Sequence, residues 1–423
     1  MIYVCDAIMG SGKSSAAIEL MNSHPEKRFL YVTPYNSEAD RIEHACAAIG
    51  MRQPEELDQF RTSKVVHTAW FIEQGLNVAS THQAFIRYDL NFLKAIREKH
   101  YTLIIDENIS PLQRVTTNRS YISAAKQAGF IDEIMPGVYT LHDKENRGEF
   151  DERLFYIMQS HDLILIDSDK KDNAYYWIMP PDFLLSFDDV YILTYLFEGQ
   201  GLYSMLRMYD IPFTYIGIEH DDASGVFTFS PTGTYVPDYT RDMSSALTLV
   251  DNAKLNADGK DFFAYSKSSY SSGKLDRKAA RNHLKNFFTN MYPCDSQCRM
   301  WSTFKDFRDD LKGNGYASMF RALNLRATNE EAQSRVLAYM VNLFVPRVYS
   351  ILARQRGEQL NDGLYALSTM VQWIWRSAIR NGQPIILYLP SRRMRDLLTD
   401  WIDDLEHGRD PKERFLEGAT DDE

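Results

Sequence analysis

A glycine-rich turn followed by lysine and serine is the part of the sequence most suited to chemistry. Residues 7–14 read Ala-Ile-Met-Gly-Ser-Gly-Lys-Ser, directly after the apolar run Met1–Cys5. The glycines permit a tight turn whose N–H groups converge on phosphate oxygens, and a following helix adds its positive end. In this pattern Lys13 reaches the β- and γ-phosphates and the Ser14 hydroxyl ligates Mg²⁺. The pattern predicts that ATP is bound by Gly10, Ser11, Gly12, Lys13, Ser14 and Ser15, with Mg²⁺ on Ser14.

Two adjacent carboxylates follow a second apolar run. Residues 101–108 read Tyr-Thr-Leu-Ile-Ile-Asp-Glu-Asn, which is typical of a buried parallel strand with ligand-binding residues at its carboxyl end. Asp106 is the expected Mg²⁺ ligand, and Glu107 is expected to orient or deprotonate the attacking water. The alternative is a strand with a charged, solvated end. The phosphate-loop pattern upstream favours the catalytic interpretation.

A third group of polar residues lies near the other end of the chain. Gln372, Arg376 and Arg380 are spaced by four residues within the apolar stretch 366–380, which predicts one helix with all three on one face. Two such arginines can clamp phosphates, because the guanidinium group is always charged. The alternative is a pair of surface arginines on an amphipathic helix.

Strands alternate with helices along the chain, which predicts an α/β fold. In the first half we expect strands at Met1–Cys5, Arg28–Thr33, Val78–Ser80, Thr102–Asp106, Asp162–Asp167, Val190–Thr194 and Phe213–Ile218, and helices at Ser14–Asn22, Ser37–Ile49 and His82–Lys99. In the second half we expect strands at Asp261–Ser266, Cys298–Trp301, Ala317–Ala322 and Pro384–Leu389, and helices at Leu275–Met291, Asn329–Phe344, Tyr365–Ile379 and Arg392–His407.

This alternation predicts two domains of similar size. The first is expected to span residues 1–220, with a partly helical insertion at about 110–160 that is too long for a plain connection. A linker rich in Gly, Pro, Ser, Thr and Asp is expected at 221–258. The second domain follows at 259–407, and residues 408–423 form an acidic, partly frayed tail.

Bulk composition limits the classes of function. The net charge of −11 argues against a polybasic binder, although it leaves room for nucleic acid in a local cleft. The four cysteines show no spacing for a zinc site and fit a reducing compartment. No apolar run approaches the length of a membrane span, and the N-terminus is expected to be the first strand and not a signal peptide. A cytoplasmic protein without a membrane partner is therefore expected.

Taken in order, these motifs resemble those of superfamily-two helicases of the DEAD/DEAH type, which have two RecA-like domains, each a mostly parallel sheet flanked by helices. Residues 7–14 are similar to motif I, Asp106–Asn108 to motif II, and Gln372–Arg380 to motif VI. Looser matches to motifs Ia, Ib, III and V are centred on Thr33, Thr81 with His82, Thr194, and Thr328.

The resemblance implies a nucleic-acid-dependent ATPase, a helicase or translocase of replication or DNA processing. It further implies that Arg376 and Arg380 complete the nucleotide site, with Gln372 beside them, and that Thr194 couples hydrolysis to movement. Thr33, Thr81, His82 and Thr328 become candidates for nucleic-acid contacts. For His82, a packed or helix-capping role is an equal alternative.

Departures from the family pattern leave room for other functions. Motif II reads Asp-Glu-Asn, and motif VI spaces its arginines by four residues instead of three. The sequences of residues 372–380 and 388–395, together with the compact length, most resemble helicases coded by phages and mobile elements. DNA is the expected nucleic acid and replication proteins are expected partners. The alternatives are an ATP-dependent regulatory or loading factor that does not unwind, a packaging-type motor ATPase and, least favoured, a small-molecule or nucleotide kinase.

Overall fold

The computed structural model describes most of the 423-residue chain. The described residues are 1–55, 64–88, 90–166, 174–323, 329–355 and 360–417. They form two compact units. Unit 1 comprises Met1–Ala7, Gly12–Tyr235 and Arg347–Gln359, and unit 2 comprises Ile8–Ser11, Val236–Pro346 and Leu360–Glu423.

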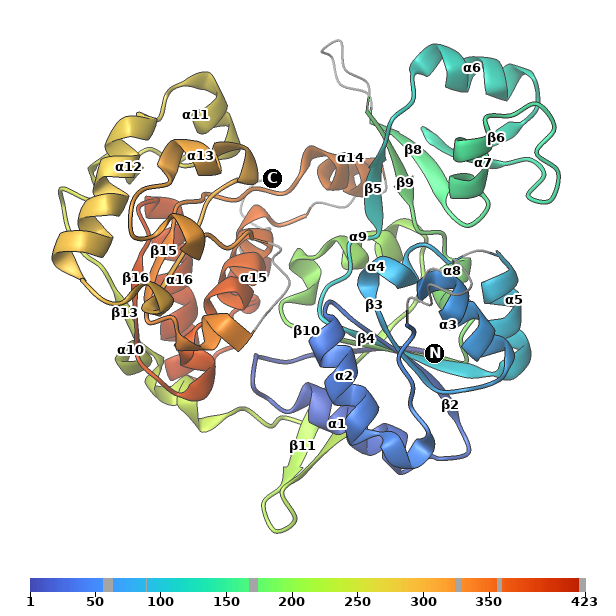
Figure 1. Cartoon of the computed structure of the whole chain (residues 1–423), viewed down its shortest axis with the longest axis horizontal. Coiled ribbons are helices and arrows are strands. Elements are labelled where there is room, and N and C mark those ends of the chain that lie inside the picture. Colours follow the sequence, from blue (N-terminus) through green and yellow to red (C-terminus); the bar gives the residue numbers. More distant parts are fainter. Residues whose placement is uncertain (56–63, 89, 167–173, 324–328, 356–359, 418–423) are drawn as a thin grey trace. The chain divides into compact units, whose positions relative to one another are not determined.

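A seven-stranded sheet forms the centre of unit 1 within the described residues (Figure 1). Its strands, in spatial order, are β12 (Val226–Ser230), β11 (Thr214–Asp221), β1 (Ile2–Asp6), β10 (Asp189–Thr194), β4 (Tyr101–Asp106), β2 (Arg28–Thr33) and β3 (Val78–Thr81). All neighbours pair in parallel except the edge strand β12, which is antiparallel to β11. Every residue of β4 is buried, as expected for a parallel strand covered on both faces.

Helices cover this sheet and connect its strands. They are α1 (Lys13–Asn22), α2 (Asn36–Ala45), α3 (Lys64–Glu73), α4 (His82–Phe85), α5 (Leu90–Lys99), α8 (Asp182–Leu185), α9 (Gly201–Met208) and α14 (Arg347–Gln355). Helix α14 comes from late in the chain and packs against α9. The hydroxyl of its Tyr349 also lies 3.0 Å from Oγ of Ser110, which follows β4. The parallel connections bring the carboxyl ends of β1, β10, β4 and β2 to one edge, which is where the motif residues stand.

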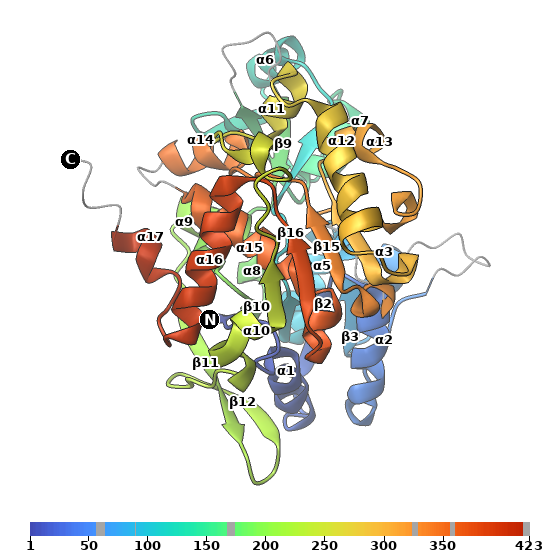
Figure 2. The ribbon, with the colours of Figure 1, turned by 90° about the vertical axis from the view of Figure 1, so that its left-hand side faces the viewer.

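The insertion after β4 is larger than expected and carries its own sheet. Five antiparallel strands are described in it: β5 (Leu112–Val115), β9 (Ala174–Ile178), β8 (Asp162–Ile166), β7 (Val138–Leu141) and β6 (Ile131–Met135). Helices α6 (Arg119–Gln127) and α7 (Glu152–Met158) accompany them, and the group lies at the opposite end of unit 1 from the β11–β12 hairpin (Figures 1 and 2). The predicted strand Asp162–Asp167 exists as β8, but it belongs to this sheet, so its assignment to the main sheet was wrong.

Unit 2 contains a four-stranded parallel sheet in its described part. The spatial order is β13 (Leu247–Leu249), β16 (Ile385–Tyr388), β15 (Val336–Tyr339) and β14 (Arg299–Ser302). The helices are α10 (Met243–Ala246), α11 (Lys267–Ser272), α12 (Arg277–Asn286), α13 (Arg308–Leu311), α15 (Asp362–Ile374), α16 (Arg392–Glu406) and α17 (Glu413–Glu417), and Figure 2 faces this unit. A core of large aromatic side chains, including Trp301, Tyr316 and Tyr388, fills one side of the sheet.

Three predictions for unit 2 were wrong. The region 329–344, predicted as a helix, contains the central strand β15. The residues Asp261–Ser266 and Ala317–Ala322, predicted as strands, form turns and a short 3₁₀-helix. The edge strand is instead β13, which falls within the predicted linker 221–258. Short apolar runs of four or five residues suit a buried helix turn and a buried strand equally well, so periodicity does not distinguish them.

The predicted arginine helix also ends earlier than expected. α15 stops at Ile374, and Ser377 is extended with φ −78° and ψ −171° before a 3₁₀-helix at Ala378–Asn381. Arg376 and Arg380 therefore do not continue the helical face of Gln372, and the single-stripe prediction was wrong. Arg380 is exposed and Arg376 is half-buried.

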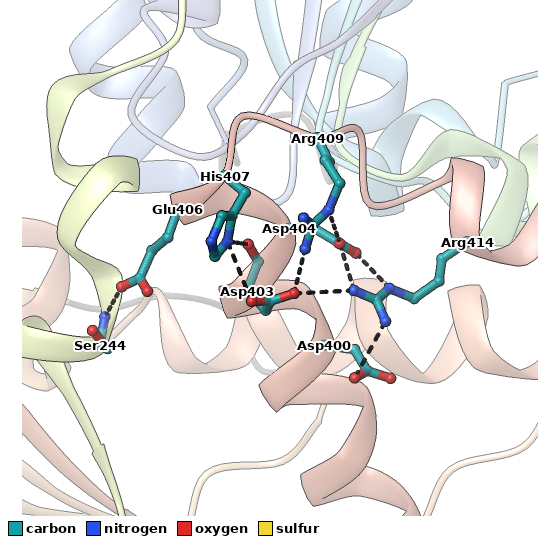
Figure 3. A network of polar contacts seen from close by, with 8 residues as sticks. All are labelled: Ser244, Asp400, Asp403, Asp404, Glu406, His407, Arg409 and Arg414. Carbon is teal, nitrogen blue, oxygen red and sulfur yellow. Dashed lines mark hydrogen bonds and ion pairs between the residues drawn. The ribbon is translucent and has the colours of Figure 1, made fainter.

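The acidic end of the chain is more ordered than a frayed tail. Arg409 Nε donates to Asp404 Oδ1 at 2.9 Å, and Arg414 Nε donates to Asp404 Oδ2 at 2.8 Å. Asp404 lies on α16 and is 3% exposed, so these bonds fasten α17 and the turn before it to α16 (Figure 3). Residues 418–423 of the predicted tail lie outside the described residues.

One of the boundaries between the two units falls between Tyr235 and Val236, inside the predicted linker. The linker is thus divided: the β11–β12 hairpin belongs to unit 1 and β13 to unit 2. Among the helices that the structure describes, none combines the length and the apolar character needed to cross a bilayer.

Candidate functional site

The phosphate-loop pattern forms the predicted strand–loop–helix arrangement. β1 ends at Asp6 and α1 begins at Lys13. Gly10 and Gly12 have φ values of 74° and 86°, a left-handed conformation that glycine adopts without strain. Phe227 of β12 packs where a side chain on Gly12 would lie, which is a second reason for glycine there.

The start of α1 fits a phosphate group. The first N–H groups of any helix lack partners within the helix, and here no side chain caps them. The hydroxyl oxygen of Ser11 is buried without a hydrogen-bond partner among the described residues. Buried donors of this kind normally find an acceptor. Phosphate oxygens would supply such acceptors, so the loop suits the triphosphate of ATP.

The two motifs predicted to hold Mg²⁺ meet at the edge of the sheet. Ser14 Oγ donates a hydrogen bond of 3.3 Å to Asp106 Oδ2. Among the described residues there is no group of three or more His, Cys, Asp or Glu side chains that would make a complete metal cage. Mg²⁺ is typically held by one or two protein oxygens together with phosphates and water. A hydroxyl beside a carboxylate, next to a phosphate loop, fits that donor set.

Asp106 is buried, which disfavours its negative charge, but two neighbouring side chains favour that charge. Burial raises the pKa of this carboxyl to about 6, while a hydrogen bond from the Tyr31 hydroxyl acts in the opposite direction. That bond, to Oδ2, is 2.6 Å long. The nearby positive charge of Lys13 also favours the ionised form. A bound cation would therefore stabilise a carboxylate that is costly to keep charged without one.

Lys13 points back into the loop. Its ammonium group donates to the carbonyl oxygen of Ala7, and burial lowers its pKa. The negative charges of Asp106, Asp6 and Glu107 partly oppose this shift. A lysine held beside several acids provides the positive point charge that phosphate binding requires.

Glu107, the expected catalytic base, has an unusual backbone. Its φ of 62° is left-handed, a conformation that costs a residue with a side chain roughly 1–2 kcal/mol. The N–H group of Glu107 donates to Leu193 O at 2.9 Å, which ties the end of β4 to β10. Strain of this kind persists where the surrounding structure imposes it, and it is frequent at functional sites.

The neighbouring strand β10 is joined to the same edge through Thr194. Its carbonyl oxygen accepts from Ala7 N at 3.0 Å, and its hydroxyl donates to Gln200 Oε1 at 2.8 Å. Asp6, at the end of β1, accepts from the backbone N–H of Leu196 at 2.7 Å. Thr194 thus connects the phosphate loop to the start of α9, as a coupling residue would, although coupling itself stays a prediction.

Of the predicted nucleic-acid residues, Thr33 is buried in unit 1, and Thr81 and His82 are hydrogen-bonded within it. Thr33 is 0% exposed, and the Thr81 hydroxyl caps α4 by accepting from Ala84 N at 3.4 Å. His82 Nε2 lies 2.8 Å from Asp106 O, and burial lowers the pKa of this histidine to about 4. These contacts favour the packed alternative for His82. Thr328 lies outside the described residues.

The remaining predicted residues lie in α1 of unit 1 and in unit 2. Ser15 is exposed in the first turn of α1. Gln372 Nε2 donates to Ser368 Oγ at 3.2 Å within α15. Arg376 and Arg380 follow that helix in unit 2, and their role at the nucleotide stays a prediction.

Three residues of the site were not identified from the sequence. Tyr31 and Asp6 act through hydrogen bonds to motif residues that are distant in the chain, and Gln200 accepts from Thr194, six residues before it. A tyrosine in an apolar strand is an ordinary core residue by pattern, so the sequence held no signal for Tyr31. Asp6 ends the first strand directly before the phosphate loop, and that position was a usable signal.

A sequence model described as the YonV C-terminal Rossmann-like domain matches residues 241–402. Two solved structures, titled "XPD_Helicase" and "Structure of S. tokodaii Xpd4", align with TM-scores of 0.47 and 0.45. Each is 11% identical, and each alignment covers 97% of this chain and 95% of the other.

A curated relative matches nearly end to end. It is the "SPbeta prophage-derived uncharacterized protein YonV" of Bacillus subtilis (strain 168), which is 30% identical over 414 residues. The match covers 95% of this chain and 98% of the relative. The parallel sheet of unit 2 agrees with the Rossmann-like description of the matching domain. This chain therefore belongs to the YonV family, whose curated relative is coded by a prophage.

Proposed function

We propose that this protein is a Mg²⁺-dependent ATPase whose hydrolysis is coupled to nucleic acid, as in a helicase or translocase of phage DNA replication or processing. The proposal includes a RecA-like character for both units and a cytoplasmic location in the bacterial host. DNA and replication proteins are the proposed partners.

One observation carries the proposal most directly. The hydroxyl of Ser14 and the carboxylate of Asp106 come from motifs 92 positions apart and lie 3.3 Å from each other. They stand at the carboxyl edge of a parallel sheet, beside an uncapped helix start and a left-handed glycine loop. Ligands of open α/β sheets bind at this edge. A merely structural serine–aspartate pair would not require the glycine loop beside it.

The roles of the residues follow from their positions. The loop N–H groups and Lys13 would bind the phosphates, and Ser14 with Asp106 would hold Mg²⁺, which neutralises phosphate charge when bound. Glu107 would orient the attacking water and accept its proton. Arg376 and Arg380 of unit 2 are proposed to stabilise the charge of the transferring phosphoryl group, with Gln372 beside them.

Two substitutions test the ATPase. Lys13→Ala should abolish hydrolysis while the fold survives, because it removes the charge that holds the phosphates. Glu107→Gln should keep ATP binding and lose turnover, because only water activation is removed. Lys27→Ala and Glu98→Gln, at exposed positions of the same unit, are the matched controls. Normal turnover by folded Lys13→Ala protein would refute the ATPase proposal.

A second candidate is an ATP-dependent regulatory or loading factor that unwinds nothing. It is favoured by the burial of Thr33 and the internal bond of His82, since two side chains expected to contact nucleic acid are enclosed within unit 1. ATPase assays with single-stranded DNA, RNA and duplex, together with a strand-separation assay, distinguish the candidates. Hydrolysis that responds to none of these nucleic acids would support the regulatory candidate.

A further inference from the structure

Tyr31 is a buried residue that meets the proposed metal site from the neighbouring strand. It lies in β2, is 0% exposed, and donates to Asp106 Oδ2 at 2.6 Å. The same oxygen accepts from Ser14 Oγ at 3.3 Å. Both hydrogen bonds that the described residues donate to the Asp106 carboxylate therefore end on Oδ2.

The position of Tyr31 is fixed by the sheet and the core. β2 and β4 are parallel neighbours, with Tyr31 opposite Ile104 and Val32 opposite Ile105. The backbone of Tyr31 therefore lies two residues short of the position opposite Asp106. Its long side chain can span this distance because strand side chains lean along the strand. Its ring belongs to the buried cluster that contains Ala39, Ile42 and Ile104. A packed ring holds the hydroxyl as a preorganised donor.

Two donors on one carboxylate oxygen restrict the rotation of the whole group. A carboxylate held by Ser14 alone could turn about its terminal torsion, which is broad for aspartate. The hydroxyl of Tyr31 adds a second, shorter bond from a different strand. The other oxygen, Oδ1, then keeps a defined direction and is available to a cation or to its water ligand.

We propose that Tyr31 is a positioning residue that orients Asp106 for Mg²⁺ in the nucleotide complex. This inference rests on the proposed function, because it assumes that Asp106 contacts the metal or its water. In this role Tyr31 acts through Asp106, so its effect should appear in how much bound Mg²⁺ strengthens the binding of nucleotide. Partners that orient metal ligands typically contribute about 10–100-fold to metal affinity.

The measurement is the dissociation constant of a fluorescent, non-hydrolysable ATP analogue, determined with excess Mg²⁺ and again with a chelator. The constant measured with chelator, divided by the constant measured with Mg²⁺, reports the coupling between metal and nucleotide. Tyr31→Phe removes only the hydroxyl and keeps the packed ring. It should lower this ratio about tenfold or more and leave the constant measured with chelator unchanged.

A matched control is available in the same sheet. Tyr101 in β4 is also 0% exposed, and its hydroxyl donates to Leu76 O at 2.6 Å, away from the phosphate loop. Tyr101→Phe removes an equivalent buried bond and should leave the ratio at the wild-type value. Thermal unfolding of both variants measures the shared loss of stability, so a general packing defect is distinguished from an effect on the metal.

Each further outcome decides the inference. A normal ratio in folded Tyr31→Phe protein, together with a ratio near one in Asp106→Asn, would overturn the role of Tyr31 alone. A ratio that rises in Tyr31→Phe would also overturn it, because the tyrosine would then compete with the metal. A ratio near one in the wild-type protein would overturn the proposed metal site and this inference together.

Discussion

The carboxyl group of Asp106 is buried, yet its proposed role requires a negative charge. Burial raises its pKa from an ordinary 3.8 to about 6. The native state therefore binds a proton more tightly than the unfolded chain, and the stability that this group contributes falls as pH rises through that window. Without a cation, ionisation of Asp106 thus weakens the fold. A bound cation would stabilise the ionised carboxylate.

This conflict predicts a specific pH dependence. The free energy of unfolding of the wild type, minus that of Asp106→Asn, should fall by on the order of 2–3 kcal/mol between about pH 4 and pH 7. Burial lowers the pKa of His82 to about 4, which gives a slope of the opposite sign, but both proteins share it. Urea unfolding without Mg²⁺ at several pH values measures the difference. A difference that does not vary with pH would show that Asp106 keeps an ordinary pKa.

The left-handed backbone of Glu107 allows a second prediction at this scale. Glycine is unstrained at a φ of 62°, whereas alanine is not. Glu107→Gly should be about 1 kcal/mol more stable than Glu107→Ala, and both should be inactive. Denaturant unfolding of the two variants checks the order. Equal stabilities would mean that the backbone relaxes at this position.

At the scale of elements, the sequence predicted unit 1 better than unit 2. The main strands of unit 1 were found because parallel strands buried on both faces are continuous apolar runs, as in Arg28–Thr33, whose predicted and observed bounds agree. β15 was missed because its four apolar residues lie among helix-forming neighbours. The phosphate loop and motif II were recognised from local spacing. Tyr31 could not be, because a hydrogen bond between distant segments leaves no local pattern.

Arg393 at the first turn of α16 connects several loops of unit 2. It is 9% exposed, donates to Asn342 Oδ1 and Leu343 O at 2.9 and 2.8 Å, and stacks 4.3 Å from the Phe344 ring. Arg393→Met should lower the free energy of unfolding by about 2–4 kcal/mol, because buried carbonyl acceptors lose their donor. Arg392→Met, at an exposed neighbour, should change it by less than about 0.5 kcal/mol. Similar losses in the two variants would contradict this role.

The insertion can be removed because its ends are adjacent. Val115 and Tyr175 face each other on the antiparallel pair β5 and β9, so a two-residue turn can join them. The shortened protein should keep its affinity for ATP, since the phosphate loop is untouched, and lose stimulation by nucleic acid if the insertion lies near the nucleic-acid path. Nucleotide-binding and stimulated-hydrolysis assays measure both. Undiminished stimulation would show that the insertion has no part in the response to nucleic acid.

At the scale of the whole molecule, the proposed function requires unit 2 to contribute to hydrolysis. Arg380→Ala should keep ATP binding and lose most nucleic-acid-stimulated turnover, because an arginine of this kind can change turnover by about 10³–10⁵-fold. Arg376→Ala should act similarly, and Arg380 is expected to dominate. The matched control is Arg392→Ala, at an exposed position of the same unit. Arg335 is unsuitable as a control because it directly precedes β15 and is bonded to Cys298 beside β14. Full stimulated activity in both arginine variants would favour the regulatory candidate.

The path of the chain between the units has a consequence for how the protein can be divided. Arg347–Gln359 leaves unit 2 to place α14 against α9 in unit 1, and the chain then returns. The matched family domain, 241–402, therefore includes a helix that completes the other unit. A fragment that stops at Tyr235 would lack the partner of Ser110 and expose the surface of α9. Neither half can be exchanged by itself, so a chimaera that joins this chain to its YonV relative at residue 235 should work only when α9 and α14 come from the same parent.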